Sequence, residues 1–246
     1  MTVFQNIPAF ILHRVEENVR PPQGWRAHSD PLETADWIEI DVRRSSDGRL
    51  IVFHDEKLST GERAGSLPYD RLSQLGVHSL DDFLGGLPAR INTILDLKNS
   101  IDDAICAEHL TTAWLAAQAA RRAAEDRSVL LTSFDSSIIA RATHYDRAIR
   151  TGLTSWPGVP LRESIPTAAM FQASILAVHI DALRPYGIPL GDSRDELAAQ
   201  VAVAHQAGLQ LTCWGAHDLT AADLRYFVDL GVAAIYVDEQ DLDLLR

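Results

Sequence analysis

Short apolar runs alternate along this chain with longer stretches of helix-forming residues. The short runs are rich in branched and aromatic side chains, which favour the pleated backbone of a β-strand. The first of them ends in His13-Arg14, as expected of a buried strand with polar residues at its carboxyl end. We expect strands at residues 9–12, 37–42, 50–53, 92–98, 128–133, 148–153, 174–180, 209–214 and 233–237.

The segments between these runs predict α-helices. The longest of them, residues 101–126, is rich in alanine and contains good helix formers throughout, so it predicts one long helix. Gly231 follows the last long helical segment and is the residue type expected just past a helix end. We expect the remaining helices at residues 30–35, 69–75, 80–84, 135–145, 161–169, 194–207, 220–230 and 241–245.

The order of these elements predicts the fold. Eight of the strands are followed by crossover segments, and eight β/α units in about 250 residues is typical of a TIM barrel. A doubly wound open sheet is the alternative, but no glycine-rich phosphate fingerprint follows the first strand. We therefore expect an α/β fold, a TIM (β/α)8 barrel, with residues 1–246 forming a single domain.

The strand at residues 50–53 has a different place in the fold. Asp47-Gly48 lies between two apolar runs and predicts a two-residue hairpin turn, which makes this strand antiparallel to its predecessor. Period-2 alternation places Glu39 and Asp41 on one face of that predecessor. The resulting register places His54 opposite Asp41, at roughly 5 Å between Cβ atoms. We expect a β-hairpin excursion after the second strand that returns His54 to the barrel rim.

The charge of the chain restricts its partners. The formal net charge is −12, from 22 basic and 34 acidic residues. An acidic balance of this size argues against nucleic acid or an anionic membrane as the main partner. An anionic small-molecule substrate would need a local positive centre, such as a metal ion or a few arginines.

The sequence also predicts a location. No apolar run approaches the about 18 residues of a membrane span, and the N-terminal residues lack a basic region and a cleavage site. Cys106 and Cys213 lie in a helical and a strand-like context, which favours buried free thiols in a reducing compartment. We expect a cytoplasmic protein. The sequence gives no indication of its oligomeric state.

Polar residues collect where the predicted strands end. In a TIM barrel the carboxyl ends of the strands form one rim, and the chemistry takes place there. The hairpin returns His54 to the same rim. The other polar or aromatic residues expected at strand ends are His13, Arg14, Glu39, Asp41, Asp96, Lys98, Ser133, Trp214 and Asp238.

This set of side chains predicts phosphate chemistry. Three carboxylates in one small space, Glu39, Asp41 and Asp96, need a cation, and oxygen ligands select Mg²⁺ or Ca²⁺. Two histidines beside that ion can serve as general acid and base near neutral pH. Arg14 and Lys98 are suited to contact phosphate oxygens. Together these groups describe metal-assisted cleavage of a phosphodiester.

Two of the basic and aromatic residues have alternative interpretations. Lys98 could contact phosphate or form a structural ion pair with Asp96 or Glu39. Trp214 could stack on the substrate or only fill the barrel mouth.

The sequence resembles the glycerophosphodiester phosphodiesterases. The resemblance extends over nearly the whole chain and is most specific in the first 100 residues. It rests on His13-Arg14, the segments Ile38-Glu39-Ile40-Asp41-Val42-Arg43 and Ser46-Asp47-Gly48-Arg49-Leu50-Ile51-Val52-Phe53-His54-Asp55, and Leu95-Asp96-Leu97-Lys98, with Ser133-Phe134-Asp135, Cys213-Trp214 and the segment 231–238 as later landmarks.

The resemblance implies a TIM barrel that hydrolyses glycerol-type phosphodiesters to an alcohol and glycerol 3-phosphate, as part of lipid metabolism. It implies that a substrate hydroxyl forms a cyclic phosphate, which water then opens. The roles it carries over are an acid/base pair of His13 and His54, metal ligands Glu39, Asp41 and Asp96, and substrate contacts Arg14, Lys98 and Trp214. We expect His13 as the base and His54 as the acid in the first step, with exchangeable roles.

Several positions depart from the family pattern. Val15 replaces the usual glycine after His-Arg, and Asp96 stands where glutamate is usual, as in the related spider-venom-type sphingomyelinase D enzymes. Trp214 is followed by Gly215-Ala216-His217. These departures favour a specialised phosphodiester. The alternatives are a lyase that releases the cyclic phosphate and a non-catalytic barrel that binds a phosphorylated ligand.

Overall fold

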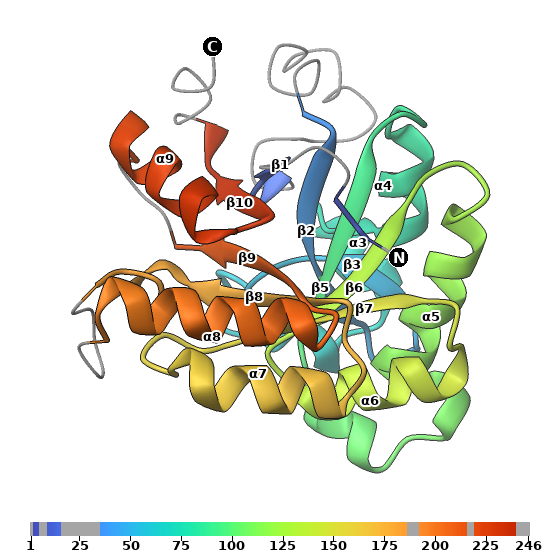
Figure 1. The fold of residues 1–246 in the computed structure, drawn as a ribbon. Coiled ribbons are helices and arrows are strands. Elements are labelled where there is room, and N and C mark those ends of the chain that lie inside the picture. Colours follow the sequence, from blue (N-terminus) through green and yellow to red (C-terminus); the bar gives the residue numbers. More distant parts are fainter. Residues whose placement is uncertain (1, 5–8, 16–34, 186–191, 216–218, 240–246) are drawn as a thin grey trace.

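The computed structural model describes residues 2–4, 9–15, 35–185, 192–215 and 219–239. Its centre is a closed ring of parallel strands, because β1 pairs with β10 on one side and with β2 on the other. The barrel strands are, in order around the ring, β1 (Ala9–Leu12), β2 (Trp37–Arg44), β5 (Asn92–Leu97), β6 (Val129–Ser133), β7 (Arg150–Thr154), β8 (Ile175–His179), β9 (Gln210–Trp214) and β10 (Ala234–Val237). The predicted TIM barrel is therefore confirmed (Figure 1).

Helices cover the outside of this barrel. They are α4 (Leu80–Gly86), α5 (Thr112–Ala123), α6 (Ser136–Tyr145), α7 (Leu161–Met170), α8 (Arg194–Gln206) and α9 (Ala221–Leu230). The short helix α3 (Tyr69–Gln74) lies away from the barrel, where its Leu72 packs in a separate apolar cluster with Ile51. The expected glycine end of α9 is confirmed, since Gly231 has φ +94°. Apolar residues between the strands and the helices form two large buried clusters, and a third cluster, with Ile11, Ile94 and Ile175, includes residues of the barrel strands.

The single long helix predicted at residues 101–126 is wrong. Two short 3₁₀ turns, Ile101–Ala104 and Glu108–Leu110, precede α5. Thr111 caps α5 by accepting a hydrogen bond from the backbone N–H of Trp114. The carboxylate of Asp103 accepts a second bond from the N–H of Thr112, at 3.0 Å. These side-chain acceptors favour a helix start at residue 112 over continuation of the upstream turns.

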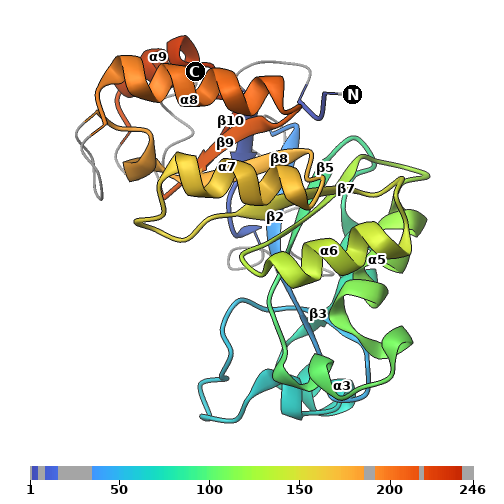
Figure 2. The same cartoon turned by 60° about the horizontal axis from the view of Figure 1, so that its bottom comes forward.

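The hairpin excursion is confirmed, but its predicted register is wrong. β3 (Leu50–Val52) pairs antiparallel with the end of β2, and the two-residue strand β4 (His78–Ser79) pairs with β3. Val52 faces Val42, so the register is shifted by one residue. The N–H of Ser45 donates to the carbonyl of Arg49, so three residues, 46–48, form the loop, and Gly48 ends it with φ +81°. Figure 2 shows the excursion at the end of the molecule opposite α8 and α9.

The other sequence predictions have mixed outcomes. The helices expected at residues 30–35 and 241–245 lie outside the described residues. Among the described residues, none of the helices is long and apolar enough to cross a membrane. Both cysteines are free, but only Cys213 is buried, and burial raises the pKa of its thiol to about 12.

Candidate active site

One pocket of about 1110 Å³ opens at the carboxyl ends of the strands. The strand-end residues reach it because all eight barrel strands run in the same direction. Every residue for which the sequence predicted a role contributes to its lining: His13, Arg14, Glu39, Asp41, His54, Asp96, Lys98 and Trp214. The structure thus brings together residues that lie up to 201 positions apart in the sequence (214 minus 13).

Three buried carboxylates form the floor of the pocket. Asp41 and Asp96 are direct neighbours in the parallel ladder between β2 and β5, and Glu39 lies two residues before Asp41 on the same face. One oxygen of each carboxylate lies within 4.8 Å of an oxygen of the other two. Burial raises the pKa of Glu39 well above its ordinary value, and the charges of Asp41 and Asp96 add to the effect. Burial and the neighbouring carboxylates therefore both disfavour the charged form of Glu39 in the absence of a further cation.

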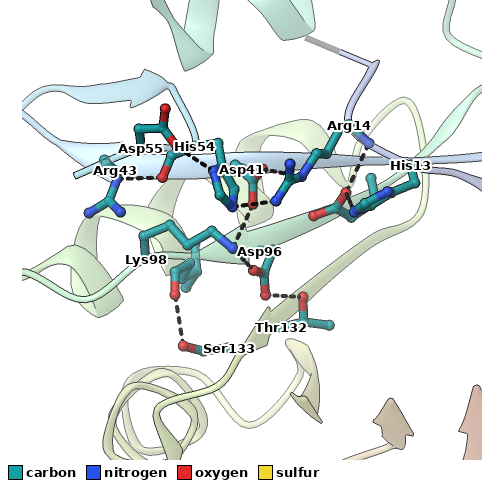
Figure 3. A network of polar contacts seen from close by, with 12 residues as sticks. His13, Arg14, Asp41, Arg43, His54, Asp55, Asp96, Lys98, Thr132 and Ser133 are labelled. Atoms are coloured by element: carbon teal, nitrogen blue, oxygen red, sulfur yellow. Dashed lines mark hydrogen bonds and ion pairs between the residues drawn. The ribbon is translucent and has the colours of Figure 1, made fainter. Parts of the chain in front are cut away.

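Lys98 holds two of these carboxylates together. Its Nζ lies 2.7 Å from Asp41 Oδ1 and 2.5 Å from Asp96 Oδ2. Burial lowers the pKa of this ammonium, but the two carboxylates outweigh burial and raise it above its ordinary value. The other oxygen of Asp96 accepts a hydrogen bond from Thr132 Oγ1 at 3.0 Å (Figure 3). The predicted alternative of a structural ion pair for Lys98 thus has direct geometric support.

The three carboxylates fit a divalent metal site. Their oxygens are hard donors, the type that Mg²⁺ and Ca²⁺ prefer. Lys98 carries one positive charge and contacts Asp41 and Asp96, so it does not balance three carboxylates by itself. A further cation would relieve the repulsion among Glu39, Asp41 and Asp96, which are all buried.

His13 is held by the last strand of the barrel. Its backbone N–H donates to the carbonyl of Val237, which continues the β1–β10 ladder by one residue. Its ring Nδ1 lies 3.0 Å from Asp238 Oδ1, and its Nε2 lies 3.9 Å from Glu39 Oε2. With a carboxylate at Nδ1, the ring presents Nε2 to the pocket in the manner of an oriented catalytic imidazole.

His54 is oriented in the same way from the opposite side of the cluster (Figure 3). Its Nδ1 lies 2.8 Å from Asp55 Oδ1, and its backbone carbonyl accepts a bond from Arg43 Nε at 2.9 Å. Arg14 donates to its Nε2, which therefore acts as an acceptor. β3 ends at Val52, so His54 lies beyond the strand and the predicted register does not position it. Its position comes from the contacts with Arg43 and Arg14.

Arg14 links the two halves of the site. Its backbone N–H donates to Glu39 Oε2 at 3.1 Å, and its guanidinium lies 3.7 Å from Asp41 Oδ2 in addition to contacting His54. The residue adopts φ +50°, a left-handed conformation that costs about 1 kcal/mol or more for a non-glycine residue. In this conformation the backbone N–H reaches Glu39 and the guanidinium lies in the pocket.

An aromatic and apolar surface forms the other side of the pocket. Phe134 follows β6, Trp156 follows β7, and Trp214 ends β9. The centroids of Phe134 and Trp156 lie 4.4 Å apart, and Trp214 meets Phe134 edge to face at 5.4 Å. The predicted position of Trp214 at the barrel mouth is thus confirmed. Its ring both lines the pocket and packs against its neighbours.

The partners of the two histidines carry no predicted role. Asp238 is expected at a strand end, and the closure of the barrel places it next to His13. Asp55 directly follows His54 and contacts its ring. Phe134 and Trp156 line the pocket, although the sequence patterns assign them no function. Pairing of the first and last strands was the signal that could have assigned Asp238.

Comparison with known proteins assigns the chain to a family. A model of the glycerophosphoryl diester phosphodiesterase family matches residues 33–242. The chain belongs to this family. It is accordingly an enzyme of the phosphoric diester hydrolase class. Comparison with curated protein sequences gave no match.

Solved structures of family members share the barrel. A phosphodiesterase from Oleispira antarctica, in complex with the product sn-glycerol-3-phosphate, matches with a TM-score of 0.73 and 17% identity over 97% of this chain and 95% of that one. A glycerophosphodiester phosphodiesterase from Parabacteroides distasonis gives 0.74 and 18%, covering 96% and 94%. One from Agrobacterium tumefaciens gives 0.67 and 22%, covering 100% of both chains. These likenesses independently support the fold.

Proposed function

We propose that this family member is a metal-dependent hydrolase of glycerophosphodiesters that uses His13 and His54 as its acid/base pair. One observation carries the proposal: two carboxylate-held imidazoles lie on opposite sides of one buried carboxylate cluster (Figure 3). A structural cluster alone would not require a titratable ring on each side. The neighbouring product complex from Oleispira antarctica supports glycerol 3-phosphate as the product.

Glu39, Asp41 and Asp96 would hold the divalent ion, Mg²⁺ or Ca²⁺. When bound, such an ion polarises a phosphate oxygen and offsets the charge that develops during displacement. Arg14 and Lys98 would contact the remaining phosphate oxygens, because both present N–H donors to the same pocket. Trp214 would contact the organic part of the substrate.

The two histidines would exchange roles between two displacements. In the first, His13 takes the proton of a substrate hydroxyl as its oxygen bonds to phosphorus. The Arg14 guanidinium would move from His54 Nε2 to a phosphate oxygen, and protonated His54 then donates from Nε2 to the leaving alcohol oxygen as the bond between that oxygen and phosphorus breaks. In the second, His54 takes a proton from water, which opens the cyclic phosphate, and His13 returns its proton to the released hydroxyl. Asp238 and Asp55 would keep each ring in the orientation that allows both transfers.

We also propose a cytoplasmic location and a role in the turnover of lipid-derived glycerophosphodiesters. The free state of both cysteines supports a reducing compartment.

Phosphorus NMR of the reaction tests this proposal. The wild type with Mg²⁺ or Ca²⁺ should convert a glycerophosphodiester to glycerol 3-phosphate, and chelation should abolish turnover. His54→Ala should lower the rate by at least about 100-fold, the typical contribution of acid/base catalysis. His144→Ala is the matched control, because this exposed histidine lies outside the pocket. Unchanged turnover in His54→Ala would contradict the assigned role, and accumulation of a cyclic phosphate would instead identify a lyase.

A further inference from the structure

The two sides of the pocket differ in chemistry. The side formed by the ends of β1 and β2 and the residues after β3 carries charged groups. The opposite side is formed by residues that follow β5, β6 and β7 and end β9; it contains large apolar and aromatic side chains beside polar ones such as Asn99, Asp135 and Ser136. We call this second surface the aromatic wall; its members are Ile101, Phe134, Trp156 and Trp214. Strands β5, β6 and β7 are consecutive in the ring, and Phe134 contacts both Trp156 and Trp214, so the three rings form one surface, with Ile101 lining the same pocket.

The wall exposes more apolar surface than its packing requires. Trp156 is 61% exposed and Ile101 is 78% exposed, and both line the pocket that holds the phosphate-binding candidates. Large apolar side chains grouped at a pocket mouth commonly mark a ligand surface. Ligand pockets typically measure about 300–1000 Å³, so a volume of about 1110 Å³ leaves room beyond a glycerol phosphate.

The charges around the wall indicate which ligand group it takes. Aromatic rings can bind either a hydrocarbon or a quaternary ammonium group. Here the ammonium of Lys98 already lies 5.5 Å from the centroid of Phe134. Phe134 also stacks against Trp156, so a second cation at this ring would meet a positive charge and a ring that already has an aromatic partner. A neutral apolar group meets no such repulsion.

We propose that the aromatic wall binds an apolar alkyl or aryl group on the leaving alcohol, so that this enzyme prefers phosphodiesters of hydrophobic alcohols. The proposal rests on the proposed function, because it places the phosphate on the charged side of the same pocket. The wall then provides substrate selection, and the chemistry stays with the histidines.

A homologous series of substrates tests the proposal. Glycerol phosphodiesters of ethanol, butanol, hexanol and octanol are compared as monomers in solution, with the metal present. Full burial of one methylene strengthens binding about fourfold. A methylene that contacts the wall on one side only gains about half of that free energy, or about twofold in binding. We therefore expect kcat/KM to rise about twofold to fourfold per methylene over the first members of the series. Trp156→Ala and Ile101→Ser should each flatten this dependence.

Two matched controls make the result specific. Ile105→Ser changes an isoleucine that is 86% exposed and does not line the pocket, so the dependence on chain length should persist. A substrate pair separates the two types of aromatic site: the choline ester and its neutral 3,3-dimethylbutyl isostere. The neutral ester should be hydrolysed at least as efficiently as the choline ester.

Three outcomes would overturn the inference. The first is a series with equal kcat/KM values for all alcohols, and the second is a choline ester preferred at least tenfold over its isostere. In the third, Trp156→Ala slows turnover only of substrate presented in phosphatidylcholine vesicles, which would identify a lipid-docking surface. In each case turnover itself persists, so the proposed function would stand. Absence of turnover for every ester would instead contradict the proposed function.

Discussion

Replacement of Glu39 by glutamine should stabilise the metal-free protein while it removes a metal ligand. The side chain keeps its size, but a buried group whose pKa lies well above its ordinary value loses its charge. Two unit charges at 4.8 Å repel by about 3.5 kcal/mol at an effective dielectric constant near 20. Asp41 and Asp96 both repel the charged form of Glu39. Lys98 offsets about one of these two repulsions, and partial protonation of Glu39 relieves part of the other. A gain of about 2 kcal/mol therefore remains at pH 8.

The effect should depend on pH in a defined direction. The folded state binds the Glu39 proton more tightly than the unfolded state, whose carboxyl has a pKa near the ordinary value of 4.5. The stabilisation of the folded state by this proton is therefore fully present below pH 4.5, and it is lost as pH rises through the higher pKa of the folded state. Glutamine does not titrate, so the difference between variant and wild type should be near zero at pH 4 and grow toward pH 8.

Thermal unfolding in chelator measures this difference. For a chain of 246 residues, about 2 kcal/mol corresponds to a midpoint shift of about 4–8 °C. Addition of Mg²⁺ or Ca²⁺ should reverse the order, because only the wild type retains the full carboxylate set. Glu125→Gln, at an exposed glutamate outside the pocket, is the control and should change little. A Glu39→Gln variant that is less stable than the wild type in chelator at pH 8 would refute the electrostatic reasoning.

Three further changes test the contacts around the site and the barrel. Asp238→Asn should lower kcat about tenfold to 100-fold with little change in KM, since it disturbs an imidazole and leaves substrate contacts intact; an equal rise in KM would contradict a purely orienting role. Asp103→Asn leaves the buried guanidinium of Arg44 without its carboxylate, so denaturant titration should show a loss of about 3 kcal/mol. Gly152→Ala places a methyl group in the space that the Ile175 side chain occupies, so the free energy of unfolding should fall by about 1–3 kcal/mol. Ile175→Ala in the same chain should restore part of that stability.

Much of the fold follows from patterns that act within one element. The apolar runs located the barrel strands, since each run supplies its own β-propensity and the parallel order follows from the crossovers. The prediction of the hairpin turn failed because Asp-Gly fits both two-residue and three-residue loops. Gly48 has a positive φ in either loop, and the absence of a positive φ at Asp47 distinguishes them. The prediction of one long helix failed because helix propensity does not account for the capping by Thr111 or for the hydrogen bond from the N–H of Thr112 to Asp103.

The site was predictable where its residues end strands. Glu39, Asp41 and Asp96 gather because β2 and β5 are parallel neighbours, a relation that the strand order predicts. The contact between His13 and Asp238 joins the first and last strands, so it follows from the closure of the predicted barrel and from no pattern within either strand. The contact between Arg14 and His54 depends on a left-handed backbone at Arg14 and on residues beyond β3, and neither has a sequence periodicity.

The most direct test of the account measures release of glycerol 3-phosphate from a glycerophosphodiester as the metal is removed and restored. The wild type should lose turnover in chelator and regain it with Mg²⁺ or Ca²⁺. Asp41→Asn and Asp96→Asn should bind the ion more weakly and regain activity only at higher concentrations of the ion. Full turnover in chelator, or equal metal dependence of wild type and both variants, would contradict the claim that these carboxylates form the metal site of a phosphodiesterase.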